Sequence, residues 1–203
     1  MLLTLRGTPL VYQGDEIGMS NFPFTDISQF NDIGVHNLWK DLVESGKVPA
    51  SEYLSNNALT SRDNSRTPMQ WDTTHNAGFT QAKKPWIVLN PNYLRVNVHA
   101  ESADKDSVLA YYQQLIRIRR SKRVLIFGAY RDISGPQPNI YAYVRSDDTG
   151  QIVVALNFSD DAIDLKLPSH IVVKHRLISN VTGAELAPTG TLHLLPWRAT
   201  MFA

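Results

Sequence analysis

The chain has 203 residues, no cysteine and a formal net charge of +1 at pH 7. This length allows one domain or two with a full core, and the lack of cysteine excludes disulfides and thiolate metal sites. A basic run from Arg117 to Arg123 lacks stacking aromatics and falls where a helix would end, so no nucleic-acid partner is expected. No apolar run is long enough to span a bilayer. We expect a cytoplasmic protein without a membrane partner.

Two short apolar segments open the chain. Leu2, Leu3 and Leu5 before Arg6-Gly7 are typical of the last turn of a helix. Leu10-Val11-Tyr12 is an unbroken apolar run, as in the strands of parallel sheets buried on both faces. Such a strand needs parallel neighbours, and no second βαβ unit follows. The chain is therefore expected to begin within a larger fold.

The middle of the chain is mostly irregular in pattern. Apolar residues from Val35 to Val43 recur at helical spacing, and Gly46 provides the stop. A second modest helix is expected before Asn57. The segment Arg62–Asp72 comes next, and few periodic apolar positions follow it around Pro85-Trp86. Long connections of this kind within a compact chain are usually binding loops or lids.

The segment Arg62–Asp72 carries the chemistry most useful for binding. Arg62 and Arg66 offer planar forks of donors, Asp63 and Asn64 supply acceptors, and Trp71 offers an apolar face. This combination suits a ligand made of hydroxyl groups. The same residues could instead form an internally salt-bridged loop that supports its neighbours.

A clear helix and then a series of strands are predicted for the second half. Asp106 or Ser107 is a good N-cap for a helix that ends near Ser121. Beyond Val124, short apolar runs separated by turn residues, among them Thr182-Gly183 and Pro188-Thr189-Gly190, are typical of an antiparallel sandwich. The runs are Ile140–Arg145, Gln151–Phe158, Ile163–Leu167, Lys174–Ile178 and Thr191–Leu195.

Several motifs together resemble one family. They are Gly7-Thr8-Pro9-Leu10-Val11-Tyr12-Gln13-Gly14-Asp15-Glu16-Ile17-Gly18-Met19, the Arg62–Asp72 segment, Pro85-Trp86 with Asn90-Pro91-Asn92-Tyr93, the helix from Ser107, and Asn157-Phe158-Ser159. The chain is similar over essentially its whole length to the α-amylase superfamily, glycoside hydrolase family 13. Within it, the branch of oligo-1,6-glucosidases, dextran glucosidases and sucrose isomerases matches best.

The resemblance implies an α/β plus all-β fold. Residues 1–123 would be the C-terminal portion of a (β/α)₈ TIM barrel, with Pro9–Gln13 as strand eight, a long loop and helix eight. Residues 124–203 would form a C-terminal antiparallel β-sandwich domain. The long loop would lie at the C-terminal face of the barrel, where such folds place their chemistry.

The resemblance also implies retaining cleavage or transfer at an α-glucosidic bond, which uses two carboxyl groups roughly 5 Å apart. In the family these lie after barrel strands that the chain lacks, and Asp15 and Glu16 are largely structural, so no catalytic residue is assigned. Arg62, Asp63 and Arg66 would be substrate-binding: Arg62 donates to the non-reducing glucose, Asp63 lies beside it, and Arg66 braces the loop. Trp71 and Trp86 are interpreted as packing residues.

The family implies no cofactor and no metal. The expected partners are a small oligosaccharide or disaccharide and the missing N-terminal barrel portion. Relatives usually carry a glutamate at the position of Gly34, where it helps define the site for the second sugar. The alternatives left open are a sucrose isomerase or glucosyltransferase, and a non-catalytic module that binds carbohydrate or a partner.

Overall fold

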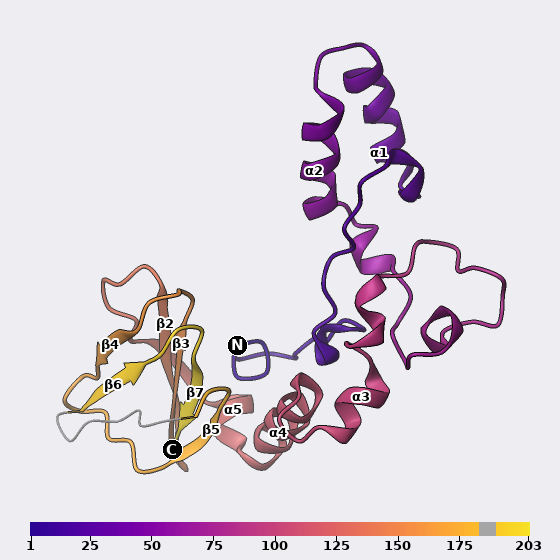
Figure 1. Cartoon of the computed structure of the whole chain (residues 1–203). Helices are drawn as coiled ribbons and strands as arrows, with labels where there is room; N and C mark the ends of the chain where they lie inside the picture. The colour runs from indigo at the N-terminus through magenta and orange to yellow at the C-terminus, as the bar shows by residue number, and fades with distance from the viewer. Residues whose placement is uncertain (183–189) are drawn as a thin grey trace. The chain divides into compact units, whose positions relative to one another are not determined.

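The computed structural model describes residues 1–182 and 190–203. Packing divides them into two compact units, one made of Met1–Leu10 with Tyr111–Ala203 and the other of Val11–Ala110. Each unit is described by itself below and can be followed by colour in Figure 1. No helix in the described ranges has both the length and the apolar character needed to cross a membrane.

The first unit, Met1–Leu10 with Tyr111–Ala203, is built on antiparallel sheets (Figure 1). One sheet has the strand order β1-β2-β3-β7-β5, and a smaller sheet pairs β4 with β6. The strands are β1 Ala129–Asp132, β2 Ile140–Asp147, β3 Gly150–Asn157, β4 Ile163–Lys166, β5 Arg176–Ser179, β6 Thr191–Leu194 and β7 Ala199–Phe202. The expected antiparallel arrangement is therefore present.

Both faces of the larger sheet are buried, which explains the unbroken apolar runs in its central strands. On one face Val153 and Ala155 of β3 share a core with Leu192 and Leu194 of β6. On the other face Ile152, Val154 and Leu156 share a second core with Leu115, Val124 and Leu125. A strand covered on both sides has no position at which a polar side chain would be favoured.

Two helices of the chain cover the second face of this sheet. They are α4 Val108–Ser121, which confirms the predicted helix, and α5 Arg123–Phe127. The Ser107 hydroxyl accepts a hydrogen bond from Ala110 N at 3.1 Å and so caps the start of α4. Of the two predicted caps, Ser107 is the one that the structure uses.

Two buried arginines tie the first residues of the chain to the sheet. Arg145 is fully buried and donates to the carbonyl oxygens of Thr4, Leu125 and Gly128, each at 2.8 Å. Arg119 donates to the carbonyl oxygens of three early residues, Leu3, Leu5 and Gly7. Burial lowers the pKa of Arg145 from its usual value, and the nearby charge of Arg119 adds to this effect. Carbonyl dipoles thus take the place of a carboxylate counter-ion around Arg145.

The second unit, Val11–Ala110, contains short helices and long loops. Its α-helices are α1 Ile33–Leu38, α2 Ala50–Thr60 and α3 Val98–Ala103, and a π-helical turn, η3 Trp39–Glu44, continues α1. The 3₁₀ turns are η1 Asp15–Ile17, η2 Ile27–Gln29, η4 Asn64–Arg66, η5 His75–Gly78 and η6 Pro91–Leu94. The helical pattern predicted from Val35 to Val43 is confirmed, and Gly46 follows with a φ of 76°.

An aromatic core holds α1 and α2 together, and the two helices form the hairpin seen in Figure 1. Phe24 stacks on Phe30 with ring centroids 4.1 Å apart, and Trp39 meets the edge of Tyr53 at 5.7 Å. The Tyr53 hydroxyl donates to Val35 O at 2.8 Å within this core. Trp39 is therefore a packing residue of this core.

Two predictions for the start of the chain are wrong in this structure. Leu10–Tyr12 forms no strand, and Leu10 is 83% exposed. A strand needs at least one neighbouring strand with which its backbone can form hydrogen bonds, and residues 1–182 and 190–203 offer Leu10–Tyr12 none. Leu2–Leu5 forms a hydrogen-bonded turn on Met1 O rather than the end of a helix, because one turn alone does not recover the cost of nucleation.

Other boundaries also differ from those predicted. The strands β1 and β7 were not predicted: β1 is exposed along its length, and β7 is only four residues long. By packing, α4 is grouped from Tyr111 onwards with the sheets, whereas the predicted domain boundary lies at 123/124. The turn residues predicted at Gly183 and at Pro188-Thr189 lie outside the described residues.

Candidate functional site

The segment that follows α2 forms a tight turn whose side chains make charged contacts. The helix α2 ends at Thr60, and its C-cap Ser61 has extended backbone angles. The turn η4 Asn64–Arg66 begins three residues after Ser61, with hydrogen bonds from Ser65 N to Arg62 O and from Arg66 N to Asp63 O. Pro68 then prevents the turn from continuing as a helix. Arg62, Asp63 and Arg66 are thereby brought within one turn of each other.

Arg62 is paired in two places with Asp32, a residue that the sequence did not single out. Arg62 Nε lies 2.5 Å from Asp32 Oδ2, and Arg62 Nη2 lies 2.7 Å from Asp32 Oδ1. The Arg62 side chain remains 64% exposed, while that of Asp32 is 10% exposed. The hydrogen bond from Arg62 holds the pKa of Asp32 below its ordinary value, and Asp32 in turn raises the pKa of Arg62. The pair fixes the guanidinium and leaves Nη1 without a hydrogen-bond partner among residues 1–182 and 190–203.

Asp63 lies beneath the site and is fully buried. Its Oδ2 accepts hydrogen bonds from the backbone amides of Asn31 at 2.9 Å and Asp32 at 3.0 Å. Its Oδ1 accepts from Arg66 Nη2. Both carboxylate oxygens are therefore occupied within the fold, and the side chain has no surface for a ligand in this structure. Asp63 positions Asp32, and through it Arg62.

Arg66 connects this cluster to Trp86. Its guanidinium pairs with Asp63 and lies 3.9 Å from Asp32 Oδ2. Its central carbon also lies 5.3 Å from the centroid of the Trp86 ring, within the range of a cation–π contact. The loop-bracing role expected for Arg66 is compatible with these contacts.

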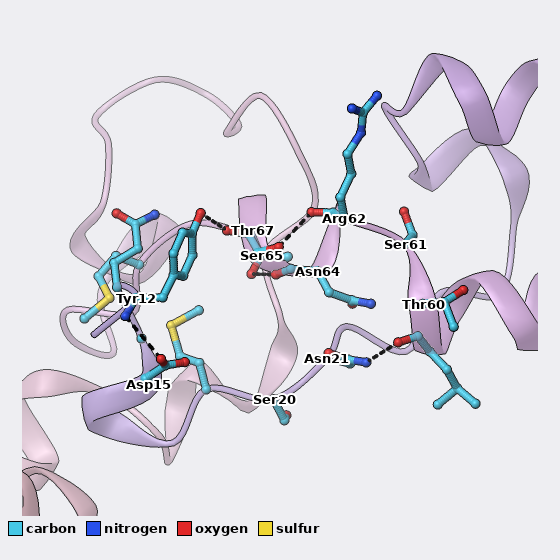
Figure 2. A pocket seen from close by; sticks show the side chains of 15 residues that line it. Tyr12, Asp15, Ser20, Asn21, Thr60, Ser61, Arg62, Asn64, Ser65 and Thr67 are labelled. Carbon is cyan, nitrogen blue, oxygen red and sulfur yellow. Dashed lines mark hydrogen bonds between the residues drawn. The ribbon is translucent and has the colours of Figure 1, made fainter. Parts of the chain in front are cut away.

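A polar hollow of about 320 Å³ adjoins the same turn (Figure 2). Its lining is rich in hydroxyl and amide groups, and the Tyr12 hydroxyl donates to Ser65 O at 2.9 Å across it. Figure 2 shows the Arg62 side chain extending away from Tyr12 and Asp15. The Arg62 guanidinium therefore points away from the part of the hollow that Tyr12 and Asp15 line (Figure 2). The lining residues are Tyr12, Gln13, Gly14, Asp15, Met19, Ser20, Asn21, Leu59, Thr60, Ser61, Arg62, Asn64, Ser65, Thr67 and Met69.

The adjacent acids Asp15 and Glu16 hold their own loop. Asp15 Oδ2 accepts from Tyr12 N at 3.1 Å, and Glu16 Oε2 accepts from Gly14 N at 2.8 Å. Gly14 has a φ of 97°, a conformation that favours glycine, and this turns the chain between the two acids and Tyr12. Within residues 1–182 and 190–203, no group of three or more His, Asp or Glu side chains is arranged to hold a metal ion.

The residue that sequence reasoning missed, Asp32, carried a signal of a different kind. Its Oδ1 accepts from Gly34 N at 2.9 Å, so it is the N-cap of α1. An aspartate before a helical pattern predicts such a cap. The pairing with Arg62, thirty residues later, depends on the return of the chain through α2.

The chain was compared with protein families and with solved structures. The alpha amylase catalytic domain matches residues 1–128. An oligo-1,6-glucosidase of Parageobacillus thermoglucosidasius is 40% identical over 98% of this chain and 35% of its own length. A glucan 1,6-alpha-glucosidase of Streptococcus pneumoniae is 37% identical over 98% of this chain and 36% of its own.

Solved structures of a trehalulose synthase and an isomaltulose synthase also match the chain. A trehalulose synthase from Pseudomonas mesoacidophila is 44% identical with a TM-score of 0.92, and an isomaltulose synthase from Klebsiella is 42% identical with a TM-score of 0.91. Each alignment covers 99% of this chain and 36% of the other. The chain therefore spans about a third of the length of the relatives it matches. Because the family match extends over more than half of the chain, the protein belongs to the alpha-amylase family.

Proposed function

We propose that the chain is part of an α-glucosidase that hydrolyses α-glucosidic bonds, α-1,6 or related, in short oligosaccharides. The observation that carries this proposal is the set of 1,6-glucosidases that are 36–40% identical over 98–100% of the chain. The Arg62–Asp32 pair adds a chemical reason, because a fixed and exposed guanidinium is suited to sugar hydroxyls. We further propose that residues 1–123 complete a barrel and 124–203 form a β-sandwich domain. The family match, which ends at residue 128, supports this boundary.

Hydrolysis with retention needs a nucleophile and an acid/base about 5 Å apart. Asp32 and Asp63 are engaged with arginines or backbone amides, and Asp15 and Glu16 hold a loop. We assign none of these four a catalytic role. The proposal places the catalytic pair in the portion of the family fold that this chain does not cover, so the chain by itself is inactive.

Arg62 has the clearest role in the proposed site. Two of its nitrogen atoms bond to Asp32, which leaves Nη1 to donate to hydroxyls of the non-reducing glucose. Loss of a charged donor to a buried sugar hydroxyl costs about 1.5–3 kcal/mol. Asp63 and Arg66 support this residue from beneath and beside it rather than contact the sugar directly.

A second candidate, isomerisation of sucrose, is favoured by the solved structures. The trehalulose and isomaltulose synthases are 42–44% identical to the chain, and one trehalulose synthase variant was solved with sucrose as substrate. Gly34 lies exposed two residues from Asp32, at the position where the resemblance to the family implies a glutamate. The neighbourhood of Arg62 thus differs from the family pattern at the place where the second sugar is expected.

A chimera tests the proposal directly. This chain replaces the matching third of the Parageobacillus oligo-1,6-glucosidase, and the products formed from isomaltose and from sucrose are measured. Glucose release from isomaltose is expected. Arg62→Ala should lower kcat/KM by roughly 10- to 100-fold, while Asp41→Ala, on an exposed helical surface, should leave it unchanged.

Two outcomes would overturn parts of this proposal. Isomaltulose or trehalulose as the main product from sucrose would favour the isomerase. Robust turnover of a nitrophenyl α-glucoside by the 203-residue chain alone would mean that its own carboxylates are catalytic.

A further inference from the structure

Trp86 is the most exposed of the four tryptophans, although its backbone is firmly held. The residue is 66% exposed, whereas its neighbour Ile87 is 4% exposed and anchors the segment. The Trp86 carbonyl oxygen accepts a hydrogen bond from Asn31 Nδ2 at 2.7 Å. A large apolar side chain held in solvent on a fixed backbone gains nothing from packing, so the earlier interpretation of Trp86 as a packing residue does not fit.

The indole forms part of the wall of a hollow of about 410 Å³. This volume lies within the range of small-molecule sites. This hollow and the one beside Tyr12 have no lining residue in common. Its lining residues are Phe22, Ser28, Gln29, Asn31 and the segment from Lys84 to Leu89.

Arg66 determines which part of the indole is open. Its guanidinium lies over the Trp86 ring at 5.3 Å while it is bound to the buried Asp63. The cation covers one face and fixes the tilt of the ring. The remaining exposed surface is therefore a preorganised aromatic plane, linked through Arg66 to the buried Asp63.

Polar groups around the plane are free to bind hydroxyls. Gln29 Oε1 accepts from the amides of Thr25 and Asp26, which orients the side chain and leaves its Nε2 available. Lys84 is exposed, and its ammonium group has no partner among residues 1–182 and 190–203. An apolar plane bordered by oriented donors matches a pyranose ring, which has an apolar face and a rim of hydroxyls.

We propose that Trp86, with Gln29 and Lys84, forms a second carbohydrate-binding site that takes a further glucosyl unit of an α-1,6-linked oligosaccharide. The inference rests on the proposed function and deepens it, because it names the residues that hold a further sugar unit of the short oligosaccharides. Arg66 links the two sites, because it contacts both Asp63 and Trp86.

The first test is sugar binding to the 203-residue chain. Isomaltotriose is titrated and the heat of binding is measured by calorimetry for the unmodified chain and for three variants. Trp86→Ala should weaken binding about tenfold, the scale of one aromatic contact, and Trp86→Phe should restore part of it. Trp71→Ala is the matched control, since Trp71 is also exposed but lines neither hollow. Equal binding by the Trp86→Ala and Trp71→Ala variants, or no binding by the unmodified chain, would overturn the proposal.

A second variant guards against misfolding of Trp86→Ala. Lys84→Ala removes only an exposed ammonium group and should weaken isomaltotriose binding about threefold. Unchanged binding by Lys84→Ala together with an unfolded Trp86→Ala would count against the site.

The chimera supplies a kinetic test. Trp86→Ala should lower kcat/KM for isomaltotriose about tenfold. The same variant should change kcat/KM for isomaltose by less than about twofold. An equal loss on both substrates would contradict a separate site. If the chimera cleaved no glucoside at all, the proposed function would fail, and the binding titration would still decide the role of Trp86.

Discussion

Different kinds of interaction stabilise the two units of this protein, each within itself. In Met1–Leu10 with Tyr111–Ala203, adjacent strands satisfy one another's backbone groups, and apolar side chains cover both faces of the sheet. In Val11–Ala110, much of the backbone is irregular, and side chains such as Asp63, Asn90 and Asn97 satisfy it. Repetitive pairing of the strands tolerates changes to single polar residues on the surface of the sheet unit. A loop region held by a few buried polar side chains depends on each of them.

Hydrogen exchange should give the largest contrast within the chain. Amides in the centre of β3 are buried, and the strand is paired on both sides, so they should exchange only when the whole sheet opens. The segment Leu10–Tyr12 is exposed and belongs to no strand pair among the described residues. Protection should differ by at least about a thousandfold, equivalent to some 4 kcal/mol. Strong protection at Leu10–Tyr12 in a monomer would contradict this structure of the segment.

The buried arginine of the sheet unit offers a second comparison. Arg145→Met leaves the carbonyl oxygens of Thr4, Leu125 and Gly128 without their shared donor. The free energy of unfolding should fall by about 3–5 kcal/mol, measured by urea denaturation. Arg123→Ala is the control, because Arg123 pairs on the surface with the exposed Asp148 and should change stability by less than about 1 kcal/mol. If both changes lowered the free energy of unfolding by similar amounts, the stabilising role assigned to the buried Arg145 would be wrong.

In the loop unit the corresponding change is Asp63→Asn. It removes the charge that binds Arg66 and weakens the acceptor for the amides of Asn31 and Asp32. Local opening should become easier by about 3 kcal/mol, so these two amides should exchange roughly a hundredfold faster. The exposed Asp41→Asn should leave their exchange unchanged, and β3 should be unaffected by either change. Unaltered exchange at Asn31 in Asp63→Asn would refute the role assigned to Asp63.

The smallest effect is expected from acid. The pKa of Asp32 is lowered, first by the hydrogen bond from Arg62 and also by that from Gly34 N. A carboxyl group whose pKa is lower in the folded state than in the unfolded state stabilises the fold at pH values above the unfolded pKa of about 3.9. That stabilisation is lost as the pH falls through the lower, folded value.

Acid titration of Asp32 by NMR checks this sign. Because Arg62 is largely exposed, the contribution should stay below about 1 kcal/mol. Arg62→Ala should move the titration of Asp32 upward, and Asp32→Asn should remove the dependence of Gly34 protection on pH in this window. A midpoint for Asp32 at its ordinary value in the unmodified chain would contradict the pairing.

Much of the sheet unit could be predicted because its pattern is local. Runs such as Ile140–Arg145 and Ile163–Leu167 are strands within one or two residues of the predicted bounds. Edge strand β1 escaped prediction because its exposed residues carry no burial pattern. The apolar run Leu10–Tyr12 was assigned to a strand on composition, yet strand formation also depends on neighbours to pair with.

The candidate site was predictable in its residue types but not in their arrangement. The sequence predicts Arg62, Asp63 and Arg66 as substrate-binding residues, and their spacing places them on one turn. Their partners are non-local: Asp32 lies thirty residues before Arg62, and Trp86 lies twenty residues after Arg66. Which carboxylate is buried and which arginine is exposed depends on those partners.

The sequence by itself determined the family, the antiparallel strands beyond Val124 and the residues that we propose to hold a sugar. Local periodicity and motif order carry that information along the chain. Only the tertiary structure decided that Asp63 is a buried support, that Asp32 holds Arg62, and that Trp86 is an open aromatic surface. These properties come from contacts between residues far apart in the chain, and burial and charge pairing have no local signature.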